Sequence, residues 1–370
     1  MFDLRRLPLW SLLFLVSPLE TAVAAAGSDW PTAAPEAVGF APDLGEKLDA
    51  AARTEAFAGL HAVVVVRHGK LVLERYFSGP DERWGDPLGD VTFGPEVVHD
   101  LRSVSKSIVG LLYGIALAES LVPGFDQVLV DQFPAYPDMQ RDPERRRMTV
   151  AHALTMTLGT EWDEDLPYTD PRNSEIAMEM ADDRYRFILE RPFVAEPGSR
   201  WDYNGGATAI LAHLVSRGAG RPIFEYARDK LFGPIGITDV EWVAGTNGEA
   251  AAASGLRMRP RDLAKIGQMV LNRGRWGDAQ LVPAAWLEQS FAPHIRTDGE
   301  LAYGYQWWLG KLYVSGAPWM GAFGNGGQRL AIFPSLDLLV VVNAGNYNKA
   351  DAWKLPVAVL TDVVFPALRD

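Results

Sequence analysis

A serine and a lysine stand three positions apart in the segment Ser103-Val104-Ser105-Lys106, at the start of a long apolar run. On a helix, residues i and i+3 share a face, so the Ser103 hydroxyl and the Lys106 amine can meet within one turn. A serine nucleophile needs a base within hydrogen-bond reach, and a lysine that loses solvation can become that base. The helix N-terminus would also favour negative charge developing at Ser103. The pair therefore predicts nucleophilic catalysis by a serine.

The same two residues allow a simpler interpretation, in which Ser103 caps a helix and the Lys106 side chain lies in solvent. The residues that follow argue against it. The stretch from Val109 to Ala116 is apolar almost all round, as expected for a helix buried within a domain. A lysine at the mouth of such a helix is placed to lose solvation, which is the condition that the chemistry requires.

Two glycine-rich segments could complete the site. Tyr203 lies directly before the apolar stretch 207–215, and a tyrosine near a lysinium ionises more easily and can carry a proton between nucleophile and leaving group. The segment Gly324-Asn325-Gly326 lies between two expected strands, where a free backbone N–H could hold an oxyanion. Taken alone, each segment also fits a simpler structure, a buried tyrosine in a turn or a bulged β-turn.

Strands are expected at both ends of the chain, around a helical middle. Residues 59–77 predict a hairpin, because a β-branched run is followed by a turn at His68-Gly69-Lys70 and a second apolar run. A stretch rich in Gly, Pro and Asp predicts a loop over 78–95. Near the C-terminus, we expect a final helix over 352–368 and four strands over 303–309, 320–323, 328–333 and 338–343.

This order of elements predicts an α+β fold, in which the N- and C-terminal segments form one antiparallel sheet and a helical region is inserted between them. The sheet-containing part covers about 27–102 and 251–370, and the helical part covers about 103–250. Proline residues interrupt the helical patterns of the middle part repeatedly. The chain from 27 to 370 is therefore expected to form one domain.

Composition narrows the class of protein. The chain has 370 residues, of which 48% are hydrophobic, enough for a sizeable core. Its net charge of -12 argues against non-specific binding of nucleic acid, which needs a surplus of cations. The absence of cysteine excludes disulfides, a cysteine nucleophile and thiolate metal sites.

Residues 1–26 have the pattern of a secretory signal peptide. Arg5 and Arg6 precede a short apolar stretch, 7–16, and small residues near Ala24 offer a cleavage site. An apolar run this short is poor for spanning a bilayer, so we expect an exported, periplasmic or secreted protein without a stable membrane span. An uncleaved anchor at the membrane interface is the alternative.

In this order along the chain, the three motifs resemble those of the serine β-lactamase and penicillin-binding-protein superfamily. The closer likeness is to the class C-like serine hydrolases, the branch that holds esterases and 6-aminohexanoate-dimer hydrolase. It extends over nearly all of 30–368 and includes the further segments 148–156, 256–263 and 303–308. The resemblance implies a β-lactamase/transpeptidase-like fold and acyl transfer through a serine.

The resemblance also assigns roles. Ser103 matches the acylated serine, Lys106 its lysine partner, and Tyr203 the tyrosine of the family's Y-x-N element. The backbone N–H groups of Ser103 and Asn325 would hold the oxyanion. Either Lys106 or Tyr203 could be the general base, because their titrations would be coupled. The candidates for substrate binding are Asn204, Gly324, Gly326, Gln328, Trp162 and Tyr168.

Two departures from the family pattern bear on the substrate. The third position of the Y-x-N element is Gly205, where β-lactamases have an asparagine that contacts the substrate's acylamino group. The strand motif is Gly324-Asn325-Gly326, without the cation that meets the antibiotic's carboxylate. We therefore expect hydrolysis of small esters or amides, with β-lactamase or D,D-peptidase activity as the alternative.

Other classes of protein fit less well. No G-x-S-x-G nucleophile elbow and no H-E-x-x-H zinc motif occurs, and no metal or cofactor is implied. A binding protein that keeps the fold without catalysis remains the second alternative. Five aromatic residues could line an apolar acyl pocket or serve in ordinary packing: Trp162, Tyr168, Trp201, Trp307 and Trp308. The oligomeric state cannot be predicted from these features.

Overall fold

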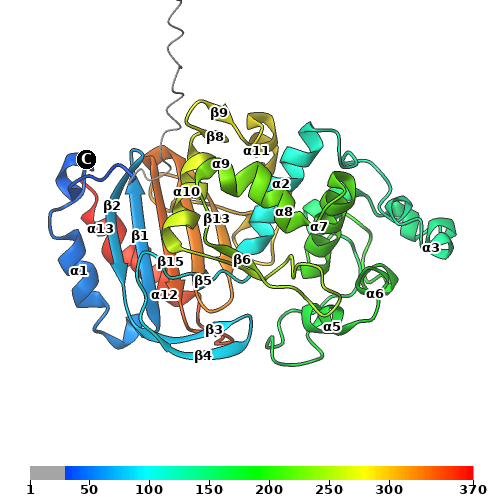
Figure 1. The fold of residues 1–370 in the computed structure, drawn as a ribbon, viewed down its shortest axis with the longest axis horizontal. Coiled ribbons are helices and arrows are strands. Elements are labelled where there is room, and N and C mark those ends of the chain that lie inside the picture. Colours follow the sequence, from blue (N-terminus) through cyan, green and yellow to red (C-terminus); the bar gives the residue numbers. More distant parts are fainter. Residues whose placement is uncertain (1–29, 370) are drawn as a thin grey trace, which may run out of the picture.

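The computed structural model describes residues 30–369, so the predicted signal peptide at 1–26 lies outside the described residues. An eight-stranded antiparallel sheet forms one side of the molecule, and helices of the chain's middle form the other (Figure 1). The strand order is β10-β11-β12-β13-β14-β15-β1-β2. The strands are β1 (Leu60–Arg67), β2 (Lys70–Tyr76), β10 (Ile295–Arg296), β11 (Ala302–Tyr303), β12 (Trp308–Lys311), β13 (Pro318–Gly324), β14 (Gln328–Phe333) and β15 (Leu338–Ala344).

The pairing of β1 with β15 joins the two ends of the chain within the sheet, one strand away from the edge strand β2. Residues of β1 alternate between two apolar cores: Val64 and Val66 enter the larger core, whereas Val63 and Val65 enter the smaller one. Both faces of this strand are therefore covered, which explains why its sequence is continuously apolar and does not alternate. The prediction of one sheet formed by both chain ends is confirmed.

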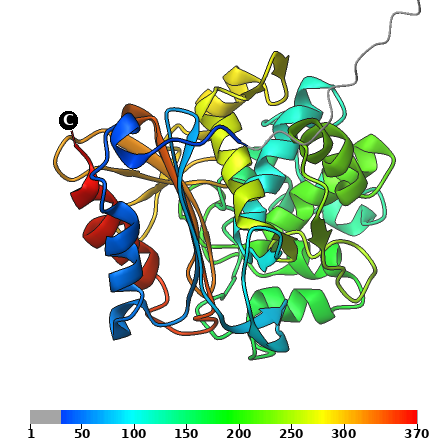
Figure 2. The ribbon, with the colours of Figure 1, turned by 60° about the vertical axis from the view of Figure 1, so that its left-hand side comes forward.

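Helices cover both faces of the sheet. α1 (Leu44–Ala51) and the C-terminal helical segment, which begins with α12 (Lys354–Ala358), lie on one face (Figure 2). α10 (Pro260–Leu271) packs against β1 and β15 on the other face. The long helices α2 (Val104–Ala118) and α7 (Gly205–Ala219) pack on each other within the helical part.

Shorter elements complete the helical part and its junction with the sheet. The helices are α3 (Pro137–Arg141), α4 (Val150–Leu154), α5 (Ser174–Met180), α6 (Arg184–Glu190), α8 (Ile223–Ala227), α9 (Gly233–Ile235) and α11 (Ala284–Ser290). A small sheet has the strand order β5-β7-β6, and its strand β5 comes shortly before Ser103 in the chain. Its strands are β5 (His99–Asp100), β6 (Val240–Trp242) and β7 (Leu256–Met258). None of the helices within 30–369 is long and apolar enough to cross a bilayer.

Two predicted elements were wrong. The expected loop at 78–95 contains a hairpin, β3 (Gly79–Arg83) and β4 (Asp86–Val91), because Trp84 and Gly85 both adopt positive φ and form a tight turn. The single strand expected over 303–309 is two strands, β11 and β12, separated by a turn at Gln306 with φ 66°. The buried Gln306 amide donates to the carbonyls of Ala153 and Leu154, so tertiary hydrogen bonds fix a turn that the apolar pattern does not reveal.

Candidate active site

Ser103 lies at the N-terminus of α2, in the N-cap position, and its side chain makes no capping hydrogen bond. The residue is 6% exposed. Arg102, directly before it, has a φ of 47°, an uncommon conformation for a residue with a side chain. The hydroxyl of Ser103 is thus free of a capping role and available to other groups, at the positive end of a buried helix.

Lys106 meets Ser103 as the i, i+3 spacing predicts. Its Nζ lies 2.9 Å from Ser103 Oγ, 3.1 Å from Glu175 Oε2 and 3.2 Å from the carbonyl oxygen of Ala253. The side chain is almost completely buried. The solvated lysine of the simpler interpretation is therefore absent, and all three N–H directions of an ammonium group have an acceptor.

Two buried glutamates, which the sequence did not single out, contact this lysine. Glu175 lies on α5, and Glu164 lies in the preceding loop with Oε2 3.9 Å from Lys106 Nζ. Both carboxylate side chains are 2% exposed. Each carboxyl group affects the pKa of the other, so they form a pair. We call Glu164 and Glu175 the carboxyl pair.

Further donors hold Glu164 in place. The indole Nε1 of Trp162 donates to Oε1 at 2.6 Å, and the Tyr168 hydroxyl donates to Oε2 at 2.9 Å. The backbone N–H of Gly205 also donates to Oε1. Trp162 and Tyr168, which were predicted to bind substrate, thus use their polar atoms in hydrogen bonds to Glu164.

The charged groups in this cluster shift one another's pKa values. Burial alone would lower the pKa of Lys106, but the carboxylate of Glu175, supported by Glu164, raises it above its ordinary value. Burial raises the pKa of Glu164 to about 7, against the opposing charge of Lys106. Burial also acts on Glu175, but Lys106 and several hydrogen bonds bring its pKa below the ordinary value. Near neutral pH, Lys106 and Glu175 are therefore ionised, and Glu164 is poised to exchange a proton.

Tyr203 lies beside Ser103 and Lys106. Its ring centroid is 4.8 Å from Lys106 Nζ, and Ser103 is close enough to affect the pKa of the Tyr203 hydroxyl. Burial raises the pKa of Tyr203, although the charge of Lys106 opposes the shift. The structure thus brings together the three residues Ser103, Lys106 and Tyr203 that the sequence selected.

Gly205, in the third position of the Y-x-N element, leaves room for the carboxyl pair. A Cβ atom at this residue would lie 2.5 Å from Glu175 Oε2 and 3.0 Å from Glu164 Oε1. No side chain fits there without displacing the glutamates. The neighbouring Asn204 caps α7 by accepting from the Ala207 N–H at 2.9 Å, so its side-chain oxygen serves the helix.

The strand motif packs against the serine segment. Gly324 ends β13, and a Cβ there would lie 2.4 Å from the carbonyl oxygen of Leu101, so glycine permits the close approach. The Asn325 side chain is held by Asn348, whose backbone N–H donates to Asn325 Oδ1 at 2.8 Å. Gly326 has a φ of 88° in the turn that follows. Ser103 and Asn325 line one cavity, as a pair of oxyanion donors requires.

Gln328 differs from the other candidates for substrate binding. It is completely buried, and its amide donates to the carbonyl oxygens of Ala344 and Asn325. Its Oε1 accepts from Asn343 at 3.1 Å. These contacts fasten β14 to β15 and leave the Gln328 side chain outside the cavity lining.

The cavity at Ser103 is narrow and partly polar. The other residues that line it are Trp84, Gly85, Arg102, Tyr168, Thr169, Glu175, Ile176, Ser254, Asn325 and Asn348. Of the five aromatic residues proposed for an acyl pocket, only Tyr168 is among them, and Trp307 is completely buried. Trp84, which the sequence did not single out, lines the cavity because the β3–β4 turn brings it there.

Arg102 brings a cation to this cavity that the strand motif lacks. Its guanidinium donates to Glu82 at 2.7 Å and lies 3.1 Å from Asp100 Oδ2. It also stacks over the ring of Tyr347, 4.7 Å from the centroid. Two carboxylates therefore balance the charge of Arg102 within the protein.

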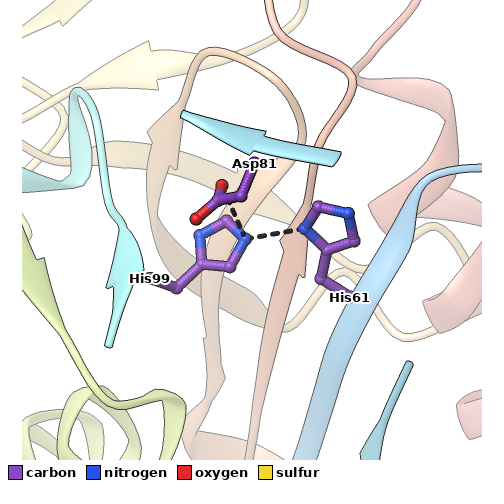
Figure 3. Close-up of side chains that lie close together, drawn as sticks. All are labelled: His61, Asp81 and His99. Carbon is purple, nitrogen blue, oxygen red and sulfur yellow. Dashed lines mark hydrogen bonds and ion pairs between the residues drawn. The ribbon is translucent and has the colours of Figure 1, made fainter. Parts of the chain in front are cut away.

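A second buried cluster consists of His61, Asp81 and His99, whose donor atoms lie within 4.8 Å of one another (Figure 3). His99 Nδ1 donates to the carbonyl of Asp100 at 2.8 Å, which leaves its Nε2 as an acceptor for His61 Nδ1 at 2.9 Å. The Tyr347 hydroxyl donates to Asp81 at 2.7 Å. Neutral imidazoles satisfy these contacts, although the same donor types also suit a metal ion.

Burial is the main reason why the pKa values of both histidines are low. It lowers the pKa of His61 to about 4, with His99 adding to the effect, and it lowers the pKa of His99 despite the charge of Asp81. Asp100 connects this cluster to Arg102 and hence to the backbone that precedes Ser103. The two histidines are therefore neutral near pH 7, and the cluster adjoins the segment that carries Ser103 through Asp100 and Arg102.

Comparisons with known proteins agree with this geometry. The family model for Beta-lactamase matches residues 48–353, which is most of the chain. The chain therefore belongs to the β-lactamase family of serine hydrolases, with the β-lactamase/transpeptidase-like fold that the sequence predicted.

Two characterised relatives are hydrolases by name. The chain is 26% identical over 330 residues to 6-aminohexanoate-dimer hydrolase of Paenarthrobacter ureafaciens, covering 81% of this chain and 74% of that protein. It is 27% identical over 139 residues to lovastatin esterase of Penicillium rubens, covering 36% of this chain and 33% of the esterase. The second match thus spans about a third of the esterase's length.

Solved structures show the same fold at lower identity. A Bacillus anthracis protein with the provisional name 6-aminohexanoate-dimer hydrolase superposes with a TM-score of 0.70 at 20% identity, covering 91% of this chain and 87% of that one. EstCE1, described as a hydrolase with promiscuous acyltransferase activity, gives 0.66 at 15% identity, covering 86% of this chain and 98% of its own. These likenesses establish the fold alone.

Proposed function

We propose that the protein hydrolyses ester or linear amide bonds of small substrates through an acyl-enzyme on Ser103. The observation that carries this proposal is the 2.9 Å contact between Lys106 Nζ and Ser103 Oγ, made by buried side chains beside a cavity. The relatives named as a dimer hydrolase and an esterase support the same reaction class.

In the proposed reaction, Ser103 Oγ attacks the substrate carbonyl and forms a tetrahedral intermediate. The backbone N–H groups of Ser103 and Asn325 stabilise its oxyanion, a contribution of about 3 to 4 kcal/mol for each donor. Tyr203, whose ring lies 4.8 Å from Lys106 Nζ, is assigned the protonation of the leaving group. Water then attacks the acyl-enzyme and releases the acid.

Esters and linear amides are favoured over β-lactams because of Gly205. The asparagine that anchors an acylamino side chain in β-lactamases is missing, and the carboxyl pair lies where its side chain would begin. The cation of Arg102 is already balanced by Glu82 and Asp100. A charged hydrogen bond contributes roughly 1.5 to 3 kcal/mol, so the missing contact to a substrate carboxylate should lower β-lactam turnover by about one to two orders of magnitude.

A substrate panel tests the proposal. Short-chain p-nitrophenyl esters, linear amides, D-amino-acid peptides and nitrocefin are compared by kcat/KM on the purified protein. We expect rapid cleavage of the aryl esters and poor or no cleavage of nitrocefin. A nitrocefin value equal to or above the ester value would favour the β-lactamase alternative.

The non-catalytic alternative is tested by covalent labelling. A fluorophosphonate probe should modify the protein stoichiometrically, and peptide mapping should locate the label on Ser103. A protein that takes up no label and cleaves none of the panel would be a binding protein with this fold. Export through residues 1–26 stays a prediction.

A further inference from the structure

The identity of the general base is the open question of the proposed reaction, and the surroundings of Lys106 bear on it directly. Its Nζ contacts three oxygen atoms, of Ser103, Glu175 and Ala253, and each of them can accept a hydrogen bond. A lysine ammonium has three donors and no acceptor. With an ion pair to Glu175 at 3.1 Å as well, Lys106 is held in its protonated form and has no lone pair for the serine proton.

Tyr203 does not supply the missing acceptor in its resting state. Its environment is desolvated, which disfavours a phenolate, and the nearest cation already forms an ion pair with Glu175. The nearest unprotonated oxygen that the Ser103 proton can reach, with Lys106 as the only group in between, is Glu175 Oε2. The path runs from Ser103 Oγ to Lys106 Nζ over 2.9 Å and from there to Glu175 Oε2 over 3.1 Å.

We propose that the carboxyl pair of Glu164 and Glu175 is the final acceptor of the Ser103 proton, and that Lys106 relays this proton by first giving one of its own protons to Glu175. This inference rests on the proposed acyl-enzyme mechanism and assigns its base. One Nζ–H proton moves to Glu175 Oε2, and the lone pair that this leaves on Nζ turns towards Ser103 and takes the Oγ–H proton as Oγ bonds to the carbonyl carbon. The leaving group takes up a proton from Tyr203 as its bond to the carbonyl carbon breaks, and the carboxyl pair restores that proton through Lys106. The same transfers activate the attacking water.

Glu164 makes the pair suitable for this task. A carboxylate alone beside an ammonium ion is a weak base, but two carboxylates in contact hold a shared proton more tightly. The pair is enclosed, and the groups that face it come from several elements: Lys106 on α2, Glu179 on α5, Ser254, Trp162, Tyr168 and Tyr203, with Tyr303 further away. The pair therefore titrates as one unit, and it takes up a proton near neutral pH.

A structural role makes a different prediction. If the carboxyl pair only neutralised a buried lysine that is itself the base, removal of Glu175 would free Lys106 to lose its proton and would raise kcat/KM at pH 7. If the pair is the acceptor, the same removal lowers kcat/KM. The sign of the change thus separates the two roles.

The experiment measures kcat/KM for a short-chain p-nitrophenyl ester between about pH 5 and 9. We expect wild-type kcat/KM to rise with pH through one inflection near neutrality. Glu175→Gln should lower kcat/KM at pH 7 by about 100-fold or more, the usual contribution of general-base catalysis. Its remaining activity should rise only at alkaline pH, where Lys106 itself loses a proton.

Glu164→Gln keeps the carboxylate that contacts Lys106 and provides a second, independent readout. We expect it to remove the inflection near neutrality and to lower kcat/KM by about 10-fold. Glu179→Gln is the matched control, because Glu179 lies one turn further along α5, is also buried and forms its ion pair with Arg184. The control should keep the wild-type inflection.

Each outcome of these measurements supports or contradicts either the relay or the proposed function. Fluorophosphonate labelling of Ser103 in every variant shows that the nucleophile is in place, and a wild-type protein without label contradicts the proposed function itself. A labelled Glu175→Gln protein with wild-type or higher kcat/KM at pH 7 would overturn the relay. If Glu175→Gln does not fold, the Glu164→Gln profile decides, and an unchanged inflection there would overturn the relay as well.

Discussion

Two buried clusters of ionisable groups adjoin the segment that carries Ser103, and they hold their protons in opposite ways. Glu164 and Glu175 contact Lys106, and burial raises the pKa of Glu164 to about 7. His61 and His99 lie behind Asp100, and burial lowers the pKa of His61 to about 4. Near neutral pH, the carboxyl pair can gain or lose a proton, whereas the histidines stay neutral. The difference separates a cluster that can take part in proton transfer from one that only supports the segment carrying Ser103.

The largest effect is expected from Ser103→Ala. Loss of the hydroxyl should lower kcat/KM for aryl esters by at least about 10⁴-fold and abolish labelling, as is usual for a nucleophile. Ser105→Ala is the control, since its hydroxyl donates to the carbonyl of Arg102 and accepts from the N–H of Leu256. That change should cost about 1 to 2 kcal/mol of stability and leave labelling intact. Inactivation by Ser105→Ala alone would show that the wrong serine was assigned.

Lys106→Met should lower kcat/KM by roughly 10³-fold, because the proton path from Ser103 is cut. It also leaves the carboxyl pair buried without its cation, which costs on the order of 3 kcal/mol when the pair is ionised. The loss of stability should therefore be greater at about pH 8 than at pH 5, where the pair can take up protons. Thermal unfolding at both pH values checks this, and near-normal acylation would exclude the role given to Lys106.

Glu164→Gln should stabilise the protein at alkaline pH. The pKa of Glu164 is about 7 in the folded chain, above its ordinary 4.5, so wild-type stability falls as pH rises through this window. Glutamine does not ionise, and the variant should gain up to about 3 kcal/mol over wild type at pH 8 and little at pH 4.5. Denaturant unfolding at the two pH values measures the difference. A variant less stable than wild type at pH 8 would contradict the assigned protonation state.

The opposite pH dependence is expected for the histidine cluster. The pKa of His61 is about 4 when folded and 6.5 otherwise, so the folded state loses stability as pH falls from 6.5 towards 4. His61→Asn keeps a donor towards His99 but cannot take up the proton. Between pH 6.5 and 4, the unfolding free energy of the variant should fall by about 2 kcal/mol less than that of the wild type. Equal slopes for both proteins would show that His61 does not resist protonation.

The smallest change is expected for Tyr168→Phe. The lost hydroxyl donates to Glu164 at 2.9 Å, and its removal destabilises the ionised carboxylate. The inflection of the kcat/KM profile should move to higher pH by a few tenths of a unit, with a roughly twofold to fivefold loss at pH 7. A shift to lower pH would mean that Tyr168 acts on the substrate alone.

The sequence was sufficient to predict the contact between Ser103 and Lys106, because their i, i+3 spacing is a local feature of one helix. The sheet formed by both chain ends was equally accessible, since apolar runs such as Val63 to Val66 mark buried strands. Where tertiary contacts decide the backbone, as at Gln306 in its buried turn, the apolar pattern predicted one strand in place of two.

The carboxyl pair could not be found in this way. Glu164 stands among other acidic residues in the stretch 161–173, which has the pattern of a loop near the site, and Glu175 follows it directly, so nothing local distinguishes these two carboxylates. Their burial depends on Lys106, which is 69 residues before Glu175. One signal was present: Gly205 removes a side chain from the Y-x-N element beside a lysine, and a buried cation that lacks one polar neighbour needs another.

The space above Gly205 has a consequence for how sites of this family interconvert. A single Gly205→Asn exchange would recreate the Y-x-N element but would place its Cβ 2.5 Å from Glu175 Oε2. Removal of Glu175 first would leave the buried Lys106 with only the more distant Glu164, 3.9 Å away, as its counter-ion. We expect each step to be harmful without the other, so the two substitutions should show sign epistasis. Directed evolution from this arrangement towards β-lactam turnover is then expected to need changes at both positions together.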